Sequence, residues 1–293
     1  MRIVGVKLSE ADPVFAGRLE EDGDHQSTVL LLSDLQAFWS DPFAWMSPDK
    51  ETAIPDGRVF PVQDVIIVPP VLPSARVLCI GLNYLAHAAE GSHRHEELPS
   101  HPTVFGRWTQ SLTTGNSAVP VPSGENGLDW EGEIAAYVGK SLSDASADAA
   151  RAAVVGFSTF NDLTARTTQK LTSQWTLGKN ADRSGPLGPI VTADEVGDLR
   201  DGLRIQTRVN GTTVQDGNSK DMIFELGETI SHISRTLILN PGDIICTGTP
   251  DGVGYARTPE WLLHPGDTVE VEVEKLGTLT NPIVSNWHRN ELQ

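Results

Sequence analysis

The chain has 293 residues, 39% of them hydrophobic and 21% charged, as expected for a protein that buries a sizeable core. Its formal net charge of −17 at pH 7 repels phosphate backbones and anionic headgroups, so we expect neither a nucleic-acid nor a membrane partner. The sequence shows no apolar N-terminal signal and no apolar run near the ~18 residues that span a bilayer. Cys79 and Cys246 lie in apolar runs as core thiols, and a reducing cytoplasm is the expected location.

Short apolar runs separated by 19 prolines and 27 glycines favour many strands over long helices. In the N-terminal part we expect strands over residues 3–8 and 28–32 and a short helical piece over residues 35–39. The proline-rich segment that follows cannot continue a central sheet ladder. We therefore predict a small N-terminal domain, residues 1–72, and a larger domain, residues 73–293, that carries the chemistry.

The next apolar run, residues 77–82, is typical of a buried strand and leads into a short helical piece with His87 and Glu90. Residues three apart on a helix lie on the same face, and a glutamate beside a histidine holds one ring tautomer and raises its basicity, as a general base requires. A surface ion pair is the alternative interpretation. His93 and His95 follow in a polar stretch that we expect to be a loop, and metal ligation by them stays open.

Glu131 and Glu133 lie within residues 128–137, a run that otherwise enters an apolar core. In a strand, residues two apart project to the same side, so the two carboxylates would point together. Two partly buried anions side by side share either a proton or a cation, and a divalent metal ion is the preferred interpretation. A solvated strand face is the alternative.

A further apolar strand over residues 154–160 is followed by Asp162, and strand ends are frequent places for functional groups. As an alternative, Asp162 would cap the helix that we expect after it. Lys179 comes shortly afterwards, and no local pattern assigns it a role.

The last third of the chain combines a hairpin turn, an amphipathic helix and a glycine-rich loop. Asn210-Gly211 is a hairpin signal, residues 222–238 have helical periodicity, and residues 269–274 alternate as a half-exposed strand. The loop over residues 247–254 can present backbone N–H groups to an anion. It lacks the Lys-Ser/Thr ending of a phosphate-binding loop, which argues against nucleotide binding.

Eight short motifs occur in order between about residue 76 and residue 286. They are Gly81-Leu82-Asn83-Tyr84 with His87 and Glu90; Pro102-x-x-Phe105; Asp129-x-Glu131-x-Glu133; Asn161-Asp162-x-Thr164-Ala165-Arg166; Trp175-Thr176-Leu177-x-Lys179; Gly188-Pro189; Asn210-Gly211; and Pro241-Gly242-Asp243 with Thr247-Gly248-Thr249-Pro250-x-Gly252-Val253-Gly254. Each is weak alone, but eight in one order rarely coincide. Together they resemble the fumarylacetoacetate hydrolase family.

The resemblance implies an α+β, β-rich fold, in which a mixed β-sandwich roll follows a small β-rich N-terminal domain. It also implies a Mg²⁺ or Mn²⁺ site whose ligands fall on Glu131, Glu133 and Asp162. Three carboxylates suit a hard, oxygen-preferring cation and leave positions open for water and a bidentate substrate. Family members use the metal to hold the 1,2-dioxo group of a 2-oxo acid, and Lys179 matches a lysine that helps to bind and polarise it.

Other residues match family positions that contact water or substrate. His87 and Glu90 match a dyad on a short lid that deprotonates water as the lid closes. Gln169 and Thr249 match substrate-contacting residues. Arg107 stands where many members have lysine, and because arginine binds carboxylate as a planar fork, we expect its contact with the distal part of the substrate to differ.

The expected activity is metal-dependent hydrolysis of the C–C bond of acylpyruvate-type β-diketo acids, such as fumarylpyruvate, in aromatic catabolism. The alternative on the same metal-enolate site is isomerisation or decarboxylation of 2-hydroxy-dienedioates or oxaloacetate. A non-catalytic scaffold that has kept the fold is a third hypothesis, which the full set of acidic, lysine and histidine side chains disfavours. The resemblance also implies a homodimer.

Overall fold

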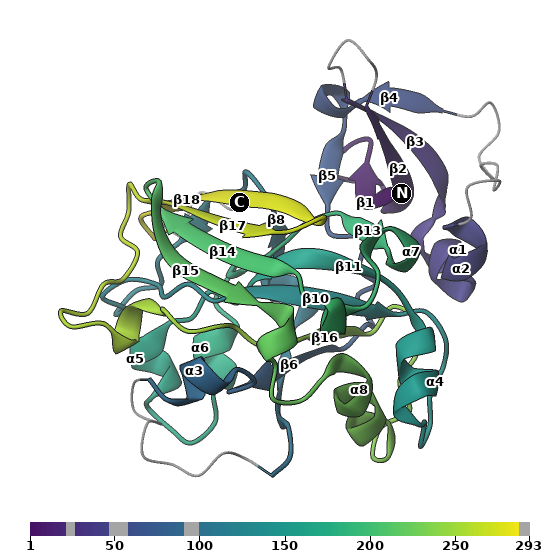
Figure 1. Ribbon diagram of the computed structural model, residues 1–293. Coiled ribbons are helices and arrows are strands. Elements are labelled where there is room, and N and C mark those ends of the chain that lie inside the picture. The colour runs from purple at the N-terminus through teal and green to yellow at the C-terminus, as the bar shows by residue number, and fades with distance from the viewer. Residues whose placement is uncertain (22–26, 47–57, 91–99, 287–293) are drawn as a thin grey trace.

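The computed structural model describes residues 1–21, 27–46, 58–90 and 100–286. Within them, two β-sheets form the body of the molecule and short helices lie around them (Figure 1). Both sheets are mixed, because each contains parallel as well as antiparallel strand pairs. The structure confirms the predicted α+β, β-rich fold class.

The larger sheet contains thirteen strands among the described residues. They are β1 (Arg2–Lys7), β2 (Phe15–Glu21), β3 (Ser27–Asp34), β4 (Val59–Pro61), β5 (Ile66–Val68), β6 (Val77–Gly81), β7 (Thr103–Arg107), β8 (Leu112–Thr114), β10 (Gly132–Val138), β11 (Val154–Asn161), β12 (Gly185–Leu187), β13 (Ile190–Thr192) and β16 (Ile244–Cys246). The main path runs β4-β3-β2-β1-β13-β11-β10-β16-β6-β7, while β5 pairs with β1 and β12 joins β8 to β11.

The smaller sheet has the order β15-β14-β17-β18-β9. Its strands are β9 (Val119–Pro120), β14 (Arg204–Val209), β15 (Thr212–Asn218), β17 (Thr268–Val273) and β18 (Gly277–Val284). The turn at Asn210-Gly211 joins β14 to β15 as an antiparallel hairpin, as predicted. The helices are α1 (Leu35–Ser40), α2 (Pro42–Trp45), α3 (Leu85–Ala88), α4 (Ala147–Ala152), α5 (Arg166–Gln169), α6 (Thr176–Lys179), α7 (Ala193–Val196) and α8 (Leu226–Ser234).

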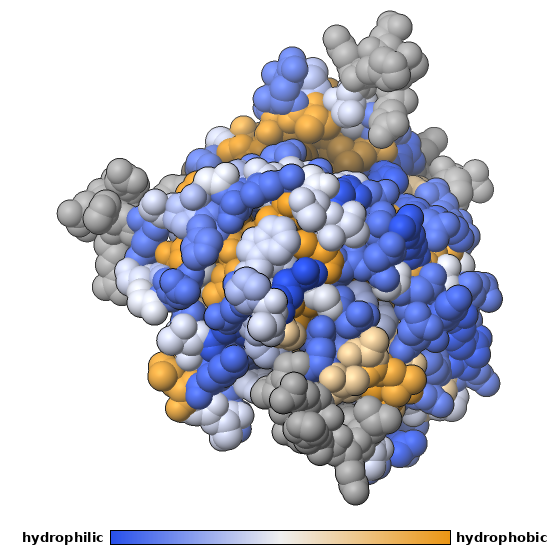
Figure 2. All heavy atoms as spheres, turned by 60° about the vertical axis from the view of Figure 1, so that its left-hand side comes forward, coloured by the Kyte–Doolittle hydropathy of each residue, from blue (hydrophilic) through white to orange (hydrophobic). Residues whose placement is uncertain are grey.

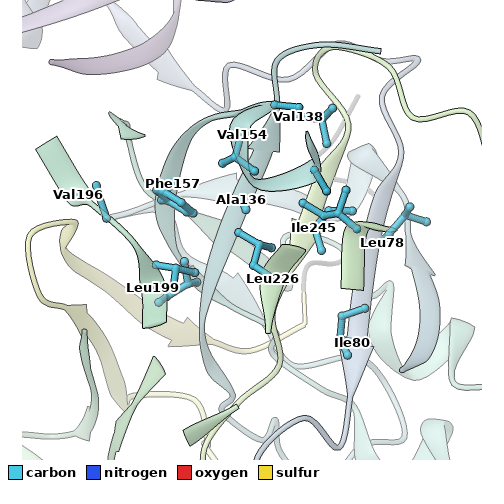
Figure 3. Close-up of a cluster of buried hydrophobic side chains, with 14 of the residues drawn as sticks. Leu78, Ile80, Ala136, Val138, Val154, Phe157, Val196, Leu199, Leu226 and Ile245 are labelled. Atoms are coloured by element: carbon cyan, nitrogen blue, oxygen red, sulfur yellow. The ribbon is translucent and has the colours of Figure 1, made fainter. Parts of the chain in front are cut away.

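β10 and β11 form the centre of the larger sheet, and every residue of both strands is buried. Ile134 and Ala136 belong to the hydrophobic cluster in Figure 3, which lies between β10, α8 and the smaller sheet. Ala135 and Tyr137 belong to a second cluster with Trp39 of α1. Because strand side chains alternate between two faces, a strand covered on both sides has a nearly continuous apolar sequence.

The N-terminal strands are part of the larger sheet, because β1 pairs with β13 through Arg2–Val191 and Ile3–Ile190. These strands also enclose a small hydrophobic cluster of their own, made of Val4, Val6, Val29 and Leu31. In Figure 1, β1 to β5 project from the upper right of the molecule. The domain boundary after residue 72 stays a prediction.

The predicted helix over residues 222–238 is shorter in the structure, where α8 ends at Ser234. Its start is set by Glu225, whose carboxylate accepts hydrogen bonds from the backbone N–H groups of Gly227 and Glu228. Pro241 follows soon after and cannot continue a helix. None of the helices in the described part of the chain is both long and apolar enough to cross a membrane.

Asn83, directly after β6, ties together segments that are far apart in the sequence. Its side-chain amide donates to the carbonyl oxygens of Phe224 (3.1 Å) and Thr247 (2.8 Å), and its side-chain oxygen accepts from the N–H of Phe224 (2.8 Å). The residue is 1% exposed. It thereby holds the chain just before α3 against the loops that precede α8 and follow β16.

Replacing Asn83 by alanine should lower the free energy of unfolding by about 2 kcal/mol or more, because the buried carbonyl oxygen of Thr247 and the partly buried backbone groups of Phe224 lose their partners. Urea denaturation followed by tryptophan fluorescence measures this change. Gln110→Ala removes an exposed amide and should change stability by less than about 0.5 kcal/mol. Equal denaturation midpoints for wild type and Asn83→Ala would show that this amide does not hold the three segments together.

Candidate active site

Three carboxylates converge where β10 begins and β11 ends. Gly132 pairs with Asn161 across the two strands, and the N–H of Asp162 donates to the carbonyl oxygen of Glu131 at 2.9 Å. This register sets Asp162 opposite Glu131, and Glu133, two residues further along β10, projects to the same side as Glu131. One carboxylate oxygen from each of the three residues lies within 4.8 Å of the other two, and the residues are buried. The structure brings the predicted metal ligands together, and their role as ligands stays a prediction.

Lys179 lies between two of these acids. Its Nζ donates to Glu131 and to Asp162, at 2.6 Å in both cases, and it is buried at the end of α6. Burial favours the neutral acid, but the charges of Lys179 and Arg166 lower the pKa of Glu131 to about 2. The pKa of Lys179 is raised, because Asp162 and Glu131 favour the ammonium form more than burial opposes it. Both groups are therefore charged at neutral pH.

Helices α5 and α6 can place their residues in one site because they pack closely at Gly178. A Cβ on Gly178 would lie 2.6 Å from the backbone N of Gln169, so a larger residue would push the helices apart. The N–H of Ala165 also donates to the carbonyl oxygen of Gly178 at 2.9 Å. Gln169 and Lys179 are thereby held on the same side of the acidic cluster.

Arg166 links Glu131 to a fourth buried acid, Asp129. The guanidinium donates to Asp129 at 2.8 Å and to Glu131 at 2.5 Å, and its third nitrogen donates to the side-chain oxygen of Gln169 at 2.9 Å. The motif analysis included Asp129 and Arg166 without assigning them a role. Their contact spans 37 positions in the sequence, so no local spacing indicates it.

Arg107 has a different place from the predicted one. Its side chain is 0% exposed, pairs with Asp162, and donates to the hydroxyl of Ser184 at 3.2 Å and to the carbonyl oxygen of Leu163 at 2.8 Å. It does not line the cavity described below. In this structure Arg107 holds the Asp162 carboxylate from the side away from the cavity and does not face the space where a substrate would lie.

Glu133 is the least compensated acid of the cluster. The hydrogen bond found for its carboxylate among the described residues comes from the N–H of Gly248, at 3.1 Å. Burial, together with the negative charges of Asp162 and Glu131, holds the pKa of Glu133 well above its usual range. A buried carboxylate with so few partners fits a site that takes up a cation.

The charge balance of the cluster supports the same conclusion. Four buried carboxyl groups face three buried cations, so full ionisation of the acids leaves one negative charge without a counter-charge, and a divalent cation would reverse the sign of the site. Oxygen ligands alone suit Mg²⁺ or Mn²⁺ and do not distinguish between them. The acids are Asp129, Glu131, Glu133 and Asp162, and the cations are Arg107, Arg166 and Lys179.

His87 and Glu90 form the predicted pair. His87 Nδ1 and the Glu90 carboxylate lie 2.8 Å apart, and both Glu90 oxygens accept from the N–H of Gly252 at 3.1 Å. Gly252 has φ +95°, and a Cβ there would lie 2.3 Å from the carbonyl oxygen of Val214. With Glu90 on Nδ1, Nε2 of the ring has no hydrogen-bond partner in the described part of the chain and is available for proton transfer. His93 and His95 lie outside the described residues.

The glycine-rich loop after β16 binds anions, but these anions are the protein's own carboxylates. Three of its backbone N–H groups each donate to a different acid of the site. Backbone donors of this kind stabilise a buried carboxylate without adding a charge. The pairs are Gly248 to Glu133 (3.1 Å), Gly252 to Glu90 (3.1 Å) and Gly254 to Asp129 (2.6 Å).

A cavity of about 230 Å³ opens onto this cluster. Six of the nine predicted site residues line it, and so do several aromatic and cationic residues for which the sequence offered no separate signal. The predicted residues are His87, Glu131, Glu133, Gln169, Lys179 and Thr249, and the others include Phe105, Arg166, Lys170, Trp175 and Tyr255. The other three predicted residues, Glu90, Asp162 and Arg107, do not line the cavity. Glu90 contacts His87, and Asp162 contacts both Lys179 and Arg107.

The family described as "Fumarylacetoacetate (FAA) hydrolase C-terminal" matches residues 76–284. This chain belongs to the fumarylacetoacetate hydrolase family. A human family member named mitochondrial oxaloacetate tautomerase FAHD2A is 38% identical over 77% of this chain and 72% of its own length. The predicted cytoplasmic location is therefore not confirmed.

Two solved structures of the family are also similar. The 5-carboxymethyl-2-hydroxymuconate delta-isomerase from Mycobacterium smegmatis has a TM-score of 0.78 and 29% identity, covering 98% of this chain and 100% of its own. Fumarylpyruvate hydrolase from Pseudomonas aeruginosa, in complex with Mn²⁺ and pyruvate, has a TM-score of 0.64 and 31% identity, covering 75% of this chain and 92% of its own. The hydrolase prediction is not confirmed, and isomerase and tautomerase relatives favour the predicted alternative.

Replacing Glu133 by glutamine should raise the stability relative to wild type without metal and lower it relative to wild type with metal. In EDTA the variant should melt higher than wild type by roughly 2 °C, because a poorly compensated buried charge is removed. With Mn²⁺ at about 100 times its Kd, wild type should gain about 2.7 kcal/mol and the variant much less. Glu228→Gln, at an exposed position, should behave as wild type in both conditions. A full Mn²⁺ response in Glu133→Gln would exclude Glu133 as a ligand.

The EDTA difference should also depend on pH. Because the pKa of Glu133 is raised in the folded protein, the wild type loses stability as pH rises from the unfolded value, about 4.3, towards the folded one. Glu133→Gln lacks this loss, so the melting-temperature difference should widen between about pH 5 and pH 8. A constant or shrinking difference over that range would contradict the raised pKa.

Proposed function

We propose that this chain catalyses keto–enol isomerisation of a short dicarboxylic 2-oxo acid, oxaloacetate or a related 2-hydroxy-dienedioate, with a divalent metal ion at the acidic cluster. The observation that carries the proposal is one cavity lined by Glu131, Glu133, Lys179 and His87. Isomerisation of this kind needs positive charge beside an enolate and one group that moves a proton. The names of the human and mycobacterial relatives support the same reaction class.

Glu131, Glu133 and Asp162 would hold the metal ion, and Mg²⁺ and Mn²⁺ both fit their oxygen chemistry. When bound, the ion supplies Lewis-acid stabilisation for negative charge on the 2-oxo oxygen. It would also turn the single uncompensated negative charge of the cluster into a net positive one. A site of that sign attracts an anionic substrate even in a chain of net charge −17.

His87 would move the proton. Its Nε2 takes a proton from C3 of the keto form, and Glu90 stabilises the resulting imidazolium through Nδ1. Lys179 donates a hydrogen bond toward the developing enolate oxygen. The His87 imidazolium then releases its proton to that oxygen, directly or through water, which gives the enol and neutral His87. One proton leaves carbon and one reaches oxygen, so no C–C bond breaks and no water is consumed. The reverse sequence gives the keto form.

Hydrolysis of acylpyruvates is the second candidate, because the same His87–Glu90 pair could deprotonate water and one structural relative is named a fumarylpyruvate hydrolase. A role in aromatic catabolism depends on this second candidate. Decarboxylation would use the same enolate site with loss of CO₂. The implied homodimer stays a prediction that size-exclusion chromatography with light scattering can test.

With Mg²⁺, the protein should accelerate the loss of enol absorbance of freshly dissolved enol-oxaloacetate while the total amount of oxaloacetate stays constant. Enzymatic determination of oxaloacetate and of pyruvate separates isomerisation from decarboxylation. Incubation with fumarylpyruvate tests hydrolysis by the appearance of fumarate. Rapid fumarate release without an effect on enol-oxaloacetate would reject isomerisation in favour of the second candidate.

His87→Asn should lower kcat for isomerisation by about 10²- to 10⁴-fold, because the amide cannot accept and return a proton at neutral pH. The Mn²⁺-induced rise in melting temperature should be kept, since His87 is not among the predicted ligands. Stopped-flow absorbance and thermal melting measure the two effects on the same samples. Activity near that of wild type would remove His87 from the mechanism.

A further inference from the structure

Among the residues that the structure describes, one cation of the cavity has no carboxylate partner. Arg166 donates to Asp129 and Glu131, and Lys179 donates to Glu131 and Asp162, so both are already neutralised by protein groups. Lys170 also lines the cavity, and within the described residues no ion pair involves it. A lysine left in this way offers its charge to a ligand.

An aromatic ring holds Lys170 in place. Its Nζ lies 4.6 Å from the ring centroid of Tyr255, and the guanidinium carbon of Arg166 lies 4.2 Å from the same centroid. Lys170 and Arg166 are four residues apart at α5, so both reach the ring from one side of the helix. The N–H of Tyr255 donates to Asp129 at 3.3 Å, which fixes the ring relative to the acidic cluster. Cation–π attraction then keeps the ammonium beside the cavity.

The cavity has a buried acidic end and an exposed cationic end. Glu131 and Glu133 are buried, whereas Lys170 is exposed. Figure 2 brings forward the side of the molecule that carries α5 and α6, where hydrophilic residues predominate and hydrophobic ones form separate patches. A substrate held at the buried end through its 2-oxo acid group would extend toward solvent and toward Lys170.

We propose that Lys170 binds the distal carboxylate of the substrate and thereby selects dicarboxylic over monocarboxylic 2-oxo acids. The inference rests on the proposed function, because it assumes that the 2-oxo acid group occupies the buried end. A cavity of about 230 Å³ is smaller than the ~300–1,000 Å³ of drug-sized sites, which suits short substrates. In a chain of net charge −17, a distal anion needs such a local cation.

The test compares oxaloacetate with its C4 monomethyl ester, which keeps the 2-oxo acid and the enolisable carbon but lacks the distal charge. Lys170→Met should raise KM for oxaloacetate about tenfold and leave KM for the ester within about twofold. The kcat values should change little, because Lys170 does not contact the reacting atoms. Lys170→Arg keeps the charge and should restore most of the selectivity.

Lys140 provides a matched control. It is also an exposed lysine on an aromatic ring, with Nζ 4.9 Å from the ring centroid of Phe43, but it does not line the cavity. Lys140→Met should leave both KM values as in wild type. Equal KM changes for oxaloacetate and the ester in Lys170→Met, or no change for either, would overturn the inference while the proposed function stands.

A binding measurement separates the inference from the activity. With Mg²⁺ present, calorimetry should show that wild type binds L-malate more tightly than L-lactate, which lacks the distal carboxylate, and that Lys170→Met loses this preference. If wild type fails to isomerise oxaloacetate but shows the Lys170-dependent preference, the proposed reaction fails while recognition of a distal carboxylate by Lys170 stands. If wild type binds both acids equally, Lys170 has no role in recognising a distal carboxylate.

Discussion

The enclosure of four carboxylates with three cations at the junction of β10 and β11 is the constraint on which the rest of the structure depends. Each of these charges is withdrawn from water, which is strongly unfavourable unless partners replace the hydration. Lys179, Arg107 and Arg166 supply most of that compensation from three different segments. The glycine-rich loop adds uncharged N–H donors. With all four acids ionised, one negative charge remains, and this imbalance makes the cluster suited to a divalent cation.

The groups proposed to move the proton and to recognise the substrate, His87 and Lys170, lie around this buried centre on a short helix and at an exposed position. His87 lies on the four-residue helix α3, which is held by Asn83 on one side and by the contact of Glu90 with Gly252 on the other. Lys170 lies at the exposed end of the cavity against Tyr255. The architecture thus separates the buried charged cluster, which is the proposed metal site, from the outer residues that are proposed to select the substrate.

A site that stabilises an enolate, as proposed for this chain, would support isomerisation, decarboxylation and hydrolysis, because all three pass through negative charge on the same oxygen. Which reaction results depends on whether a proton, CO₂ or water is exchanged at the neighbouring carbon. His87 is able to serve the first and the third. The fold alone therefore does not decide among them, and the relatives named as tautomerase and isomerase give the isomerisation proposal its weight.

The sequence by itself determined the features that depend on near neighbours: the common direction of Glu131 and Glu133, the His87–Glu90 pair, the hairpin at residue 210, the β-rich fold class and the family. Strand and helix periodicity fix the relative direction of side chains a few positions apart, so these relations are visible in the order of residues. Only the tertiary structure decided the partners that lie far along the chain. It turned Arg107 away from the cavity, joined Asp129 to Arg166, directed the glycine-rich loop at the protein's own acids and set Lys170 against Tyr255. Such contacts depend on how sheets and loops pack, and no local spacing encodes that packing.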